Sequence, residues 1–168
     1  MSIIRNFIII IFIGFLATSV SSQEVKKVGI FKDWEAIVLV RQAGKVCFAQ
    51  STPVLQAPKS NTREAKMFVS FRTGEKVNNE ISITGGYEFN NKNSITATSG
   101  KSKYKFDIAQ GGFAWIADTK IENKMIKTMQ RGSRIMITGY NQKGSQTIDH
   151  YSLLGFTKAY NAAKTSCD

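Results

Sequence analysis

The chain has 168 residues, with 23 Lys and Arg against 12 Asp and Glu, two cysteines and one histidine, and its formal net charge is +11. The basic residues are mostly lysines scattered along the chain, whereas nucleic-acid-binding faces cluster Arg and Lys with aromatic side chains. We therefore expect no nucleic-acid partner, and the charge favours only weakly an anionic envelope surface or an acidic partner.

Residues 1–22 predict a cleaved secretory signal peptide. Arg5 gives a short positive start, residues 7–15 carry no polar side chain, and small residues end the segment at Ser22. The apolar run is about half of the roughly 20 residues that cross a bilayer, so a retained membrane anchor is the weaker alternative. We expect a single mature domain, residues 23–168, in the periplasm or secreted.

Cys47 and Cys167 predict a disulfide, because an even pair of cysteines in an exported protein is normally oxidised. Neither cysteine belongs to a Cys-X-X-Cys motif or has a neighbouring histidine, so a reactive thiol is the less favoured alternative. The bond would tie an early strand to the last turn of the chain.

The first half of the mature chain alternates apolar and polar residues, as strands of an antiparallel sheet do. A first hairpin turns at 42–44, and a proline-punctuated surface loop follows at 51–63. The predicted strands of this half are 34–40, 45–50, 66–72, 80–84, 94–98, 104–108 and 113–116.

Helical spacing replaces the alternation after Asp118. Thr119 and Glu122 fit a capping box, apolar residues recur at helical intervals, and Gly132 ends the run. A second hairpin, 134–140 with 146–153, turns at residues 142–144. The chain then closes with a helix over 156–166.

The apolar face of this closing helix consists of Phe156, Tyr160 and Ala163. Together the elements predict an all-β fold, an antiparallel β-sandwich with two short helices in the C-terminal half. The alternative architecture is a closed barrel around a ligand cavity.

The sequence offers few candidate catalytic residues. The single histidine, His150, lies in a predicted strand, so its neighbour Asp149 points to the opposite face and cannot orient it in a triad. The acidic residues are spread singly, and the two cysteines are expected to be paired. We therefore expect no catalytic, metal-binding or cofactor-binding residues and a protein that is not an enzyme.

The large aromatic residues are expected mostly in the core. Those assigned to the core are Trp34, Phe68, Phe71, Phe106, Phe113, Trp115 and Phe156. Three others lie near predicted turns and are the candidate surface contacts: Tyr87, Phe89 and Tyr140.

The order of several segments resembles the invasion-associated locus B family of exported alphaproteobacterial proteins. These segments are the signal peptide, Trp34, Lys45-Val-Cys47-Phe, Phe113-Ala-Trp115, the run from Lys127 to Ser133, Tyr151-Ser-Leu-Leu-Gly-Phe156 and Cys167. The resemblance implies a small exported all-β domain with no assigned catalytic residues and no known cofactor.

Three functions follow in order of preference. The first is a non-enzymatic envelope or secreted protein that binds a protein or surface partner. The second is a periplasmic carrier of a small ligand in an apolar cavity, and the third is an envelope hydrolase that uses His150.

The signal peptide gives the first testable prediction. Amino-terminal sequencing of the protein recovered outside the cytoplasm should begin at Gln23, because signal peptidase cleaves after small residues. A protein recovered with Met1 in place would contradict cleavage.

Overall fold

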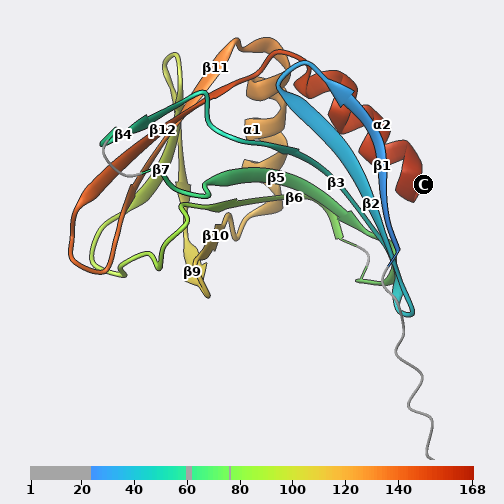
Figure 1. The fold of residues 1–168 in the computed structure, drawn as a ribbon, viewed down its shortest axis with the longest axis horizontal. Coiled ribbons are helices and arrows are strands. Elements are labelled where there is room, and N and C mark those ends of the chain that lie inside the picture. The colour runs from blue at the N-terminus through green and yellow to red at the C-terminus, as the bar shows by residue number, and fades with distance from the viewer. Residues whose placement is uncertain (1–23, 60–61, 76) are drawn as a thin grey trace, which may run out of the picture.

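The computed structural model describes residues 24–59, 62–75 and 77–168 (Figure 1). The predicted signal peptide lies outside these residues. Two antiparallel sheets and two helices make up the fold, in a sandwich-like arrangement that confirms the predicted architecture.

The larger sheet has seven strands in the order β1-β2-β3-β5-β6-β10-β9. The strands are β1 (Glu24–Phe31), β2 (Trp34–Arg41), β3 (Gly44–Ser51), β5 (Lys66–Arg72), β6 (Val77–Thr84), β9 (Ile108–Gln110) and β10 (Phe113–Trp115). The β2–β3 hairpin turns at the predicted place. A short 3-10 helix, η1 (Thr73–Glu75), follows β5.

The smaller sheet has five strands in the order β4-β12-β11-β7-β8. They are β4 (Leu55–Ala57), β7 (Ile95–Ser99), β8 (Ser102–Phe106), β11 (Arg134–Tyr140) and β12 (Gln146–Ser152). The β11–β12 pair is the predicted second hairpin. Both sheets end in free edge strands and neither closes, so the alternative of a closed barrel is wrong.

Three strands depart from the predicted set. β1 was not predicted, because a bulge between Lys27 and Gly29 interrupts its alternation. β4 lies inside the predicted loop. The predicted strand 104–108 is split at Asp107, whose backbone N–H donates to the Trp115 carbonyl as the chain passes from one sheet to the other.

Helix α1 (Thr119–Arg131) begins at the residue predicted as its cap, and its N-cap lies one residue earlier. Asp118 is the N-cap, and its carboxylate accepts a hydrogen bond from the Lys120 N–H. The predicted capping box is wrong, since the carboxylate of Glu122 instead accepts the N–H of Ile81 in β6 at 2.8 Å. Gly132 does end the helix.

Helix α2 (Phe156–Cys167) packs on the inner face of the larger sheet, against β1, β2, β3 and β5 (Figure 1). Its predicted apolar face is buried as expected: Phe156, Tyr160 and Ala163 are 8% exposed or less. Gly155 precedes it with a φ of 90°, and a Cβ there would lie 1.7 Å from the Phe31 carbonyl oxygen. This entry to α2 therefore requires glycine.

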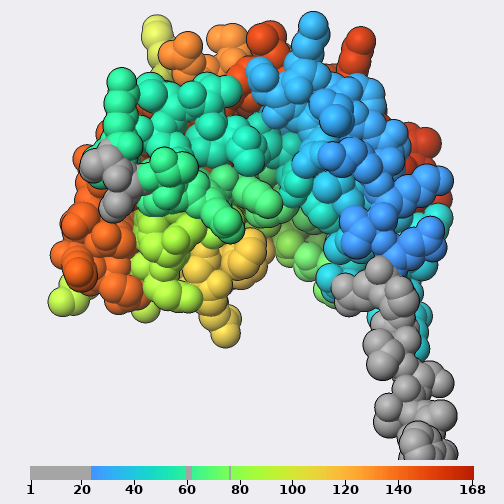
Figure 2. Space-filling model, in the orientation of Figure 1, coloured from blue at the N-terminus to red at the C-terminus, as the bar shows by residue number. Residues whose placement is uncertain are grey.

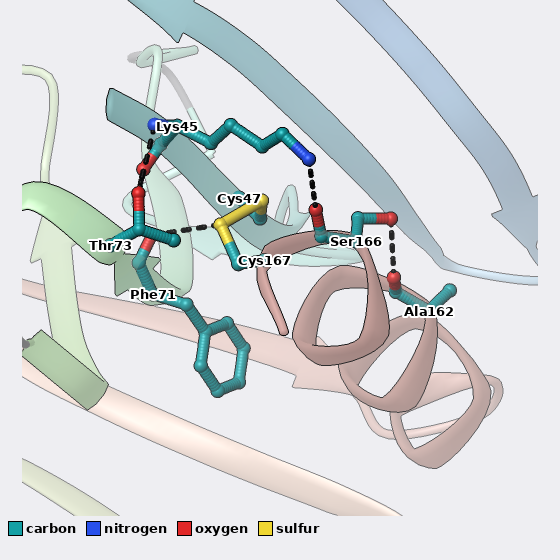
Figure 3. The surroundings of a disulfide bond; sticks show 7 residues. All are labelled: Lys45, Cys47, Phe71, Thr73, Ala162, Ser166 and Cys167. Atoms are coloured by element: carbon teal, nitrogen blue, oxygen red, sulfur yellow. Dashed lines mark hydrogen bonds between the residues drawn. A yellow bond between two sulfur atoms is a disulfide. The ribbon is translucent and has the colours of Figure 1, made fainter. Parts of the chain in front are cut away.

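Both ends of α2 are held to the sheet. At its start, the Phe156 ring meets the Trp34 ring edge-on at 4.8 Å between centroids. At its end, the predicted disulfide joins Cys167 to Cys47 of β3 (Figure 3), and Lys45 Nζ donates to the Ser166 carbonyl nearby. The helix is thus clamped across the strands that it covers.

The second prediction concerns this disulfide, which closes a loop of 120 positions. In the chain-entropy model such a bond stabilises the fold by on the order of 5 kcal/mol. Replacing both cysteines, Cys47→Ala with Cys167→Ala, should lower the denaturant midpoint strongly. Reductant should lower the denaturant midpoint of the native protein to that of the variant and should leave the midpoint of the variant unchanged. Equal midpoints of the native protein and the variant without reductant would contradict a stabilising role of the bond.

Candidate binding surface

Four aromatic side chains lie together on the outer face of the larger sheet, opposite to the core. They come from three strands and are Phe48 of β3, Phe68 of β5, and Phe113 and Trp115 of β10, which β6 joins to β5. Three of them were predicted in the core, and this assignment is wrong. Phe113 is 37% exposed, while Phe68 and Trp115 are half-buried.

The alternation of the strands explains the correction. In β10 the small Ala114 faces the core and is fully buried, which places Phe113 and Trp115 on the other face. In β5, Met67 and Val69 take the inner positions and leave Phe68 outside. The other predicted core aromatics, Trp34, Phe71, Phe106 and Phe156, are buried as expected.

The four rings form one continuous row, which we call the aromatic row. The ring centroids of Phe48 and Phe68 are 5.9 Å apart, those of Phe68 and Phe113 are 6.2 Å apart, and those of Phe113 and Trp115 are 5.8 Å apart. These separations are in the range of favourable aromatic pairs. The rings therefore support one another without cover from another element.

Small residues lie between the rings and make the surface hollow. Ser70 pairs with Phe48 across β3 and β5, and Ser82 lies opposite Phe68. Both serines are buried at the base of a groove of about 500 Å³ that the aromatic row lines. Figure 2 shows the hollow between the β9–β10 segment, in yellow, and the β2–β3 hairpin.

Charged side chains border the groove at one end. The guanidinium of Arg72 donates to both carboxylate oxygens of Glu80, at 2.6 and 2.7 Å, and to Glu75 at 2.8 Å. The hydrogen bond to Glu80 is the largest cause of the raised pKa of Arg72. This network fixes a polar rim beside the apolar floor, while Arg41 lies at the same end.

A second cleft, of about 600 Å³, adjoins the groove and shares Trp115 and Glu80 with it. Its wall includes Glu122, a carboxylate that is 6% exposed. Burial raises the pKa of Glu122, and the nearby carboxylates of Glu80 and Asp118 raise it further, against the hydrogen bond from Ile81. Trp115 thus separates an apolar groove from a more polar cleft.

The three predicted surface contacts lie elsewhere, and one of them is buried. Phe89 is only 5% exposed, so its assignment as an exposed contact is wrong. Its ring packs edge-on against Tyr87 at 5.1 Å, and both rings fill the space over Gly139. Tyr87 and Tyr140 are half-buried, and their hydroxyls bond to Thr147 and Gln146.

A buried ion pair next to these tyrosines was missed by sequence reasoning. The Arg63 guanidinium contacts Asp149 through two hydrogen bonds of 2.7 and 3.0 Å, and the side chains are 9% and 4% exposed. Arg63 also lies 5.6 Å from the centre of the Tyr87 ring and donates to the Gly85 carbonyl. The pair holds the segment after β4 against β12, which is a structural role.

The geometry around His150 offers no triad. Asp149 faces the interior and is paired with Arg63, while His150 faces the other side of β12. Among residues 24–59, 62–75 and 77–168, no group of three His, Cys, Asp or Glu side chains is arranged to hold a metal ion. No helix in the described part of the chain is long and apolar enough to span a membrane.

Comparison with known proteins identifies a family. A family model described as "Invasion associated locus B (IalB) protein" matches residues 34–164. No curated protein and no solved structure matches the chain. The matched span contains the whole aromatic row and Cys47, and it ends shortly before Cys167.

The third prediction compares an outer aromatic side chain with an inner one. Phe113→Ala should lower the free energy of unfolding by about 1 kcal/mol, because it removes two aromatic contacts at a solvated surface. Phe156→Ala should cost about 3–5 kcal/mol, because it opens a cavity in the core. Urea unfolding of both variants measures the difference, and equal losses would place Phe113 in the core after all.

Proposed function

The chain belongs to the invasion associated locus B family, and on this basis we propose that it is an exported, non-enzymatic protein that binds an apolar segment of a protein partner. The aromatic row and its groove are the proposed binding surface. Phe113 is its most exposed ring.

The single observation that carries the proposal is the aromatic row itself. Four large rings contact one another on a sheet face that the core does not use. Protein interfaces concentrate their binding energy in a few aromatic and arginine side chains surrounded by a polar rim. The groove has this composition, with the rings in the middle and the Arg72–Glu80 pair at the border.

An extended protein segment suits the groove better than a small ligand. Small-molecule sites enclose most of the ligand surface. Here the groove is lined by residues of β2, β3, β5, β6 and β10 along the outer face of the sheet. A segment that places apolar side chains against the rings, over Ser70 and Ser82, would remove apolar surface of both molecules from water without entering the core.

Export and the lack of catalysis are supported by separate features. The Cys47–Cys167 disulfide is of the kind that persists in oxidising compartments, and the sequence of residues 1–22 has the order of a signal peptide. The only histidine has no acid partner on its own face of β12. These features favour a binding protein in the periplasm or outside the cell.

The fourth prediction identifies and then measures the partner. A photo-crosslinking amino acid in place of Phe113 should capture one protein in intact cells, because Phe113 is the most exposed ring of the row. The same group in place of Leu55, which is 46% exposed on the smaller sheet, is the matched control. Mass spectrometry names the captured protein.

Binding is then measured with the purified partner. Phe113→Ser combined with Trp115→Ser should weaken the complex about tenfold or more, because truncation of hot-spot aromatic residues costs about 2 kcal/mol or more. Leu55→Ser should leave the dissociation constant unchanged. Equal affinities of the native protein, the Phe113→Ser, Trp115→Ser variant and Leu55→Ser would refute the proposed surface. Equal crosslinking from positions 113 and 55 would refute it as well.

A further inference from the structure

Helix α1 presents a row of four cations to solvent. Lys120, Lys124, Lys127 and Arg131 are all exposed. Their spacing of four, three and four residues places them within an arc of about 60° on a helix of 3.6 residues per turn. The row spans 12 residues, or about 16 Å along the helix axis, and we call it the α1 basic row.

The row is not balanced by acidic side chains. Within the described residues, none of the four cations forms an ion pair with a carboxylate. The one acidic residue of α1, Glu122, is buried and accepts the Ile81 N–H on the opposite side. The positive charge of the row therefore faces solvent uncompensated.

Helix stability accounts for Arg131 alone, because the helix dipole favours a cation in the last turn. Like charges three or four residues apart repel one another and destabilise a helix, and the row contains three such neighbouring pairs. Lys120 also lies in the first turn, where the helix dipole disfavours a cation. By contrast, the two exposed lysines of α2, Lys158 and Lys164, are six residues apart and do not align.

The shape of the row suits a flat anionic surface. α1 lies between the two sheets in the view of Figure 1, where it contacts β6 of one sheet and β8 of the other, and its buried face is apolar apart from Glu122. Its outer face is convex, and cations within such a narrow arc reach one plane together. A soluble polyanion is usually held in a positively charged groove instead.

We propose that the α1 basic row docks the protein onto an anionic phospholipid membrane. Lysines near a membrane surface each contribute to binding by attraction to the anionic headgroups. Ile121, which is 37% exposed, lies about 60° around the helix from Lys124 and adds an apolar contact at the edge of the row. The formal net charge, which is +11 for the whole chain and +10 once Arg5 is removed with the signal peptide, attracts the whole molecule to an anionic surface.

The docked orientation would keep the aromatic row free. The aromatic row belongs to the outer face of the larger sheet, whereas α1 packs on the inner side of β6. Membrane docking is thus a property separate from partner binding, and each can hold or fail without the other.

The test uses the protein recovered after export, with its amino terminus verified, and phospholipid vesicles. Co-sedimentation should show binding to vesicles that contain phosphatidylglycerol and none to vesicles of phosphatidylcholine alone. Lys124→Glu combined with Lys127→Glu should weaken binding at least tenfold, and added salt should weaken it for the native protein.

The matched control is Lys158→Glu combined with Lys164→Glu on α2. It changes the net charge by the same amount and should weaken binding much less than the α1 variant. Equal losses in the two variants, or no binding of the native protein to phosphatidylglycerol, would overturn the proposal, as would binding to soluble polyphosphate without binding to vesicles. Thermal unfolding confirms that both variants fold.

Discussion

The clamping of α2 onto the inner face of the larger sheet is the constraint on which the rest of the structure depends. Aromatic contacts run from Trp34 through Phe156 and Tyr160 to Phe71, and the disulfide of Cys167 holds the far end. With α2 and the smaller sheet on this side, the inner face is filled by one continuous core. Any further large side chain on these strands has to face outwards.

The aromatic row is the consequence of this constraint. β3, β5 and β10 each carry apolar residues on both faces, but only one face is covered by other elements. Ser70 and Ser82 keep the uncovered face hollow, whereas larger side chains at these positions would fill the groove. A sheet whose second face only needed to be soluble would carry polar residues there. The placement of four rings on this face is therefore the main evidence for binding.

Much of the fold was predictable because its signals are local. Both hairpins and both helices follow from turn residues and from a spacing that changes from two to helical. β1 escaped prediction because its bulge breaks the alternation, and the split at Asp107 depends on which sheet each half joins. The Arg63–Asp149 pair joins residues 86 positions apart, a distance that no local pattern spans.

The candidate site was harder to predict for a related reason. Alternation separates the residues of a strand into two faces, but it does not say which face is buried. Large aromatic residues were assigned to the inside, while in β10 the inside belongs to Ala114. The signal available was that Met67, Phe68 and Val69 are all apolar, so that both faces of β5 are apolar. A strand of this kind either has both faces covered by other elements of the fold or exposes one apolar face to solvent.

Tryptophan fluorescence tests the central claim most directly, because the chain has two tryptophans in opposite environments. Trp34 is 1% exposed in the core, and Trp115 lies half-buried in the aromatic row. Acrylamide should readily quench the tryptophan fluorescence of the native protein. The fluorescence of the Trp115→Phe variant should resist quenching, because only the buried Trp34 remains. Quenching that is unchanged by Trp115→Phe would show that Trp115 is shielded from solvent and would contradict an open binding face.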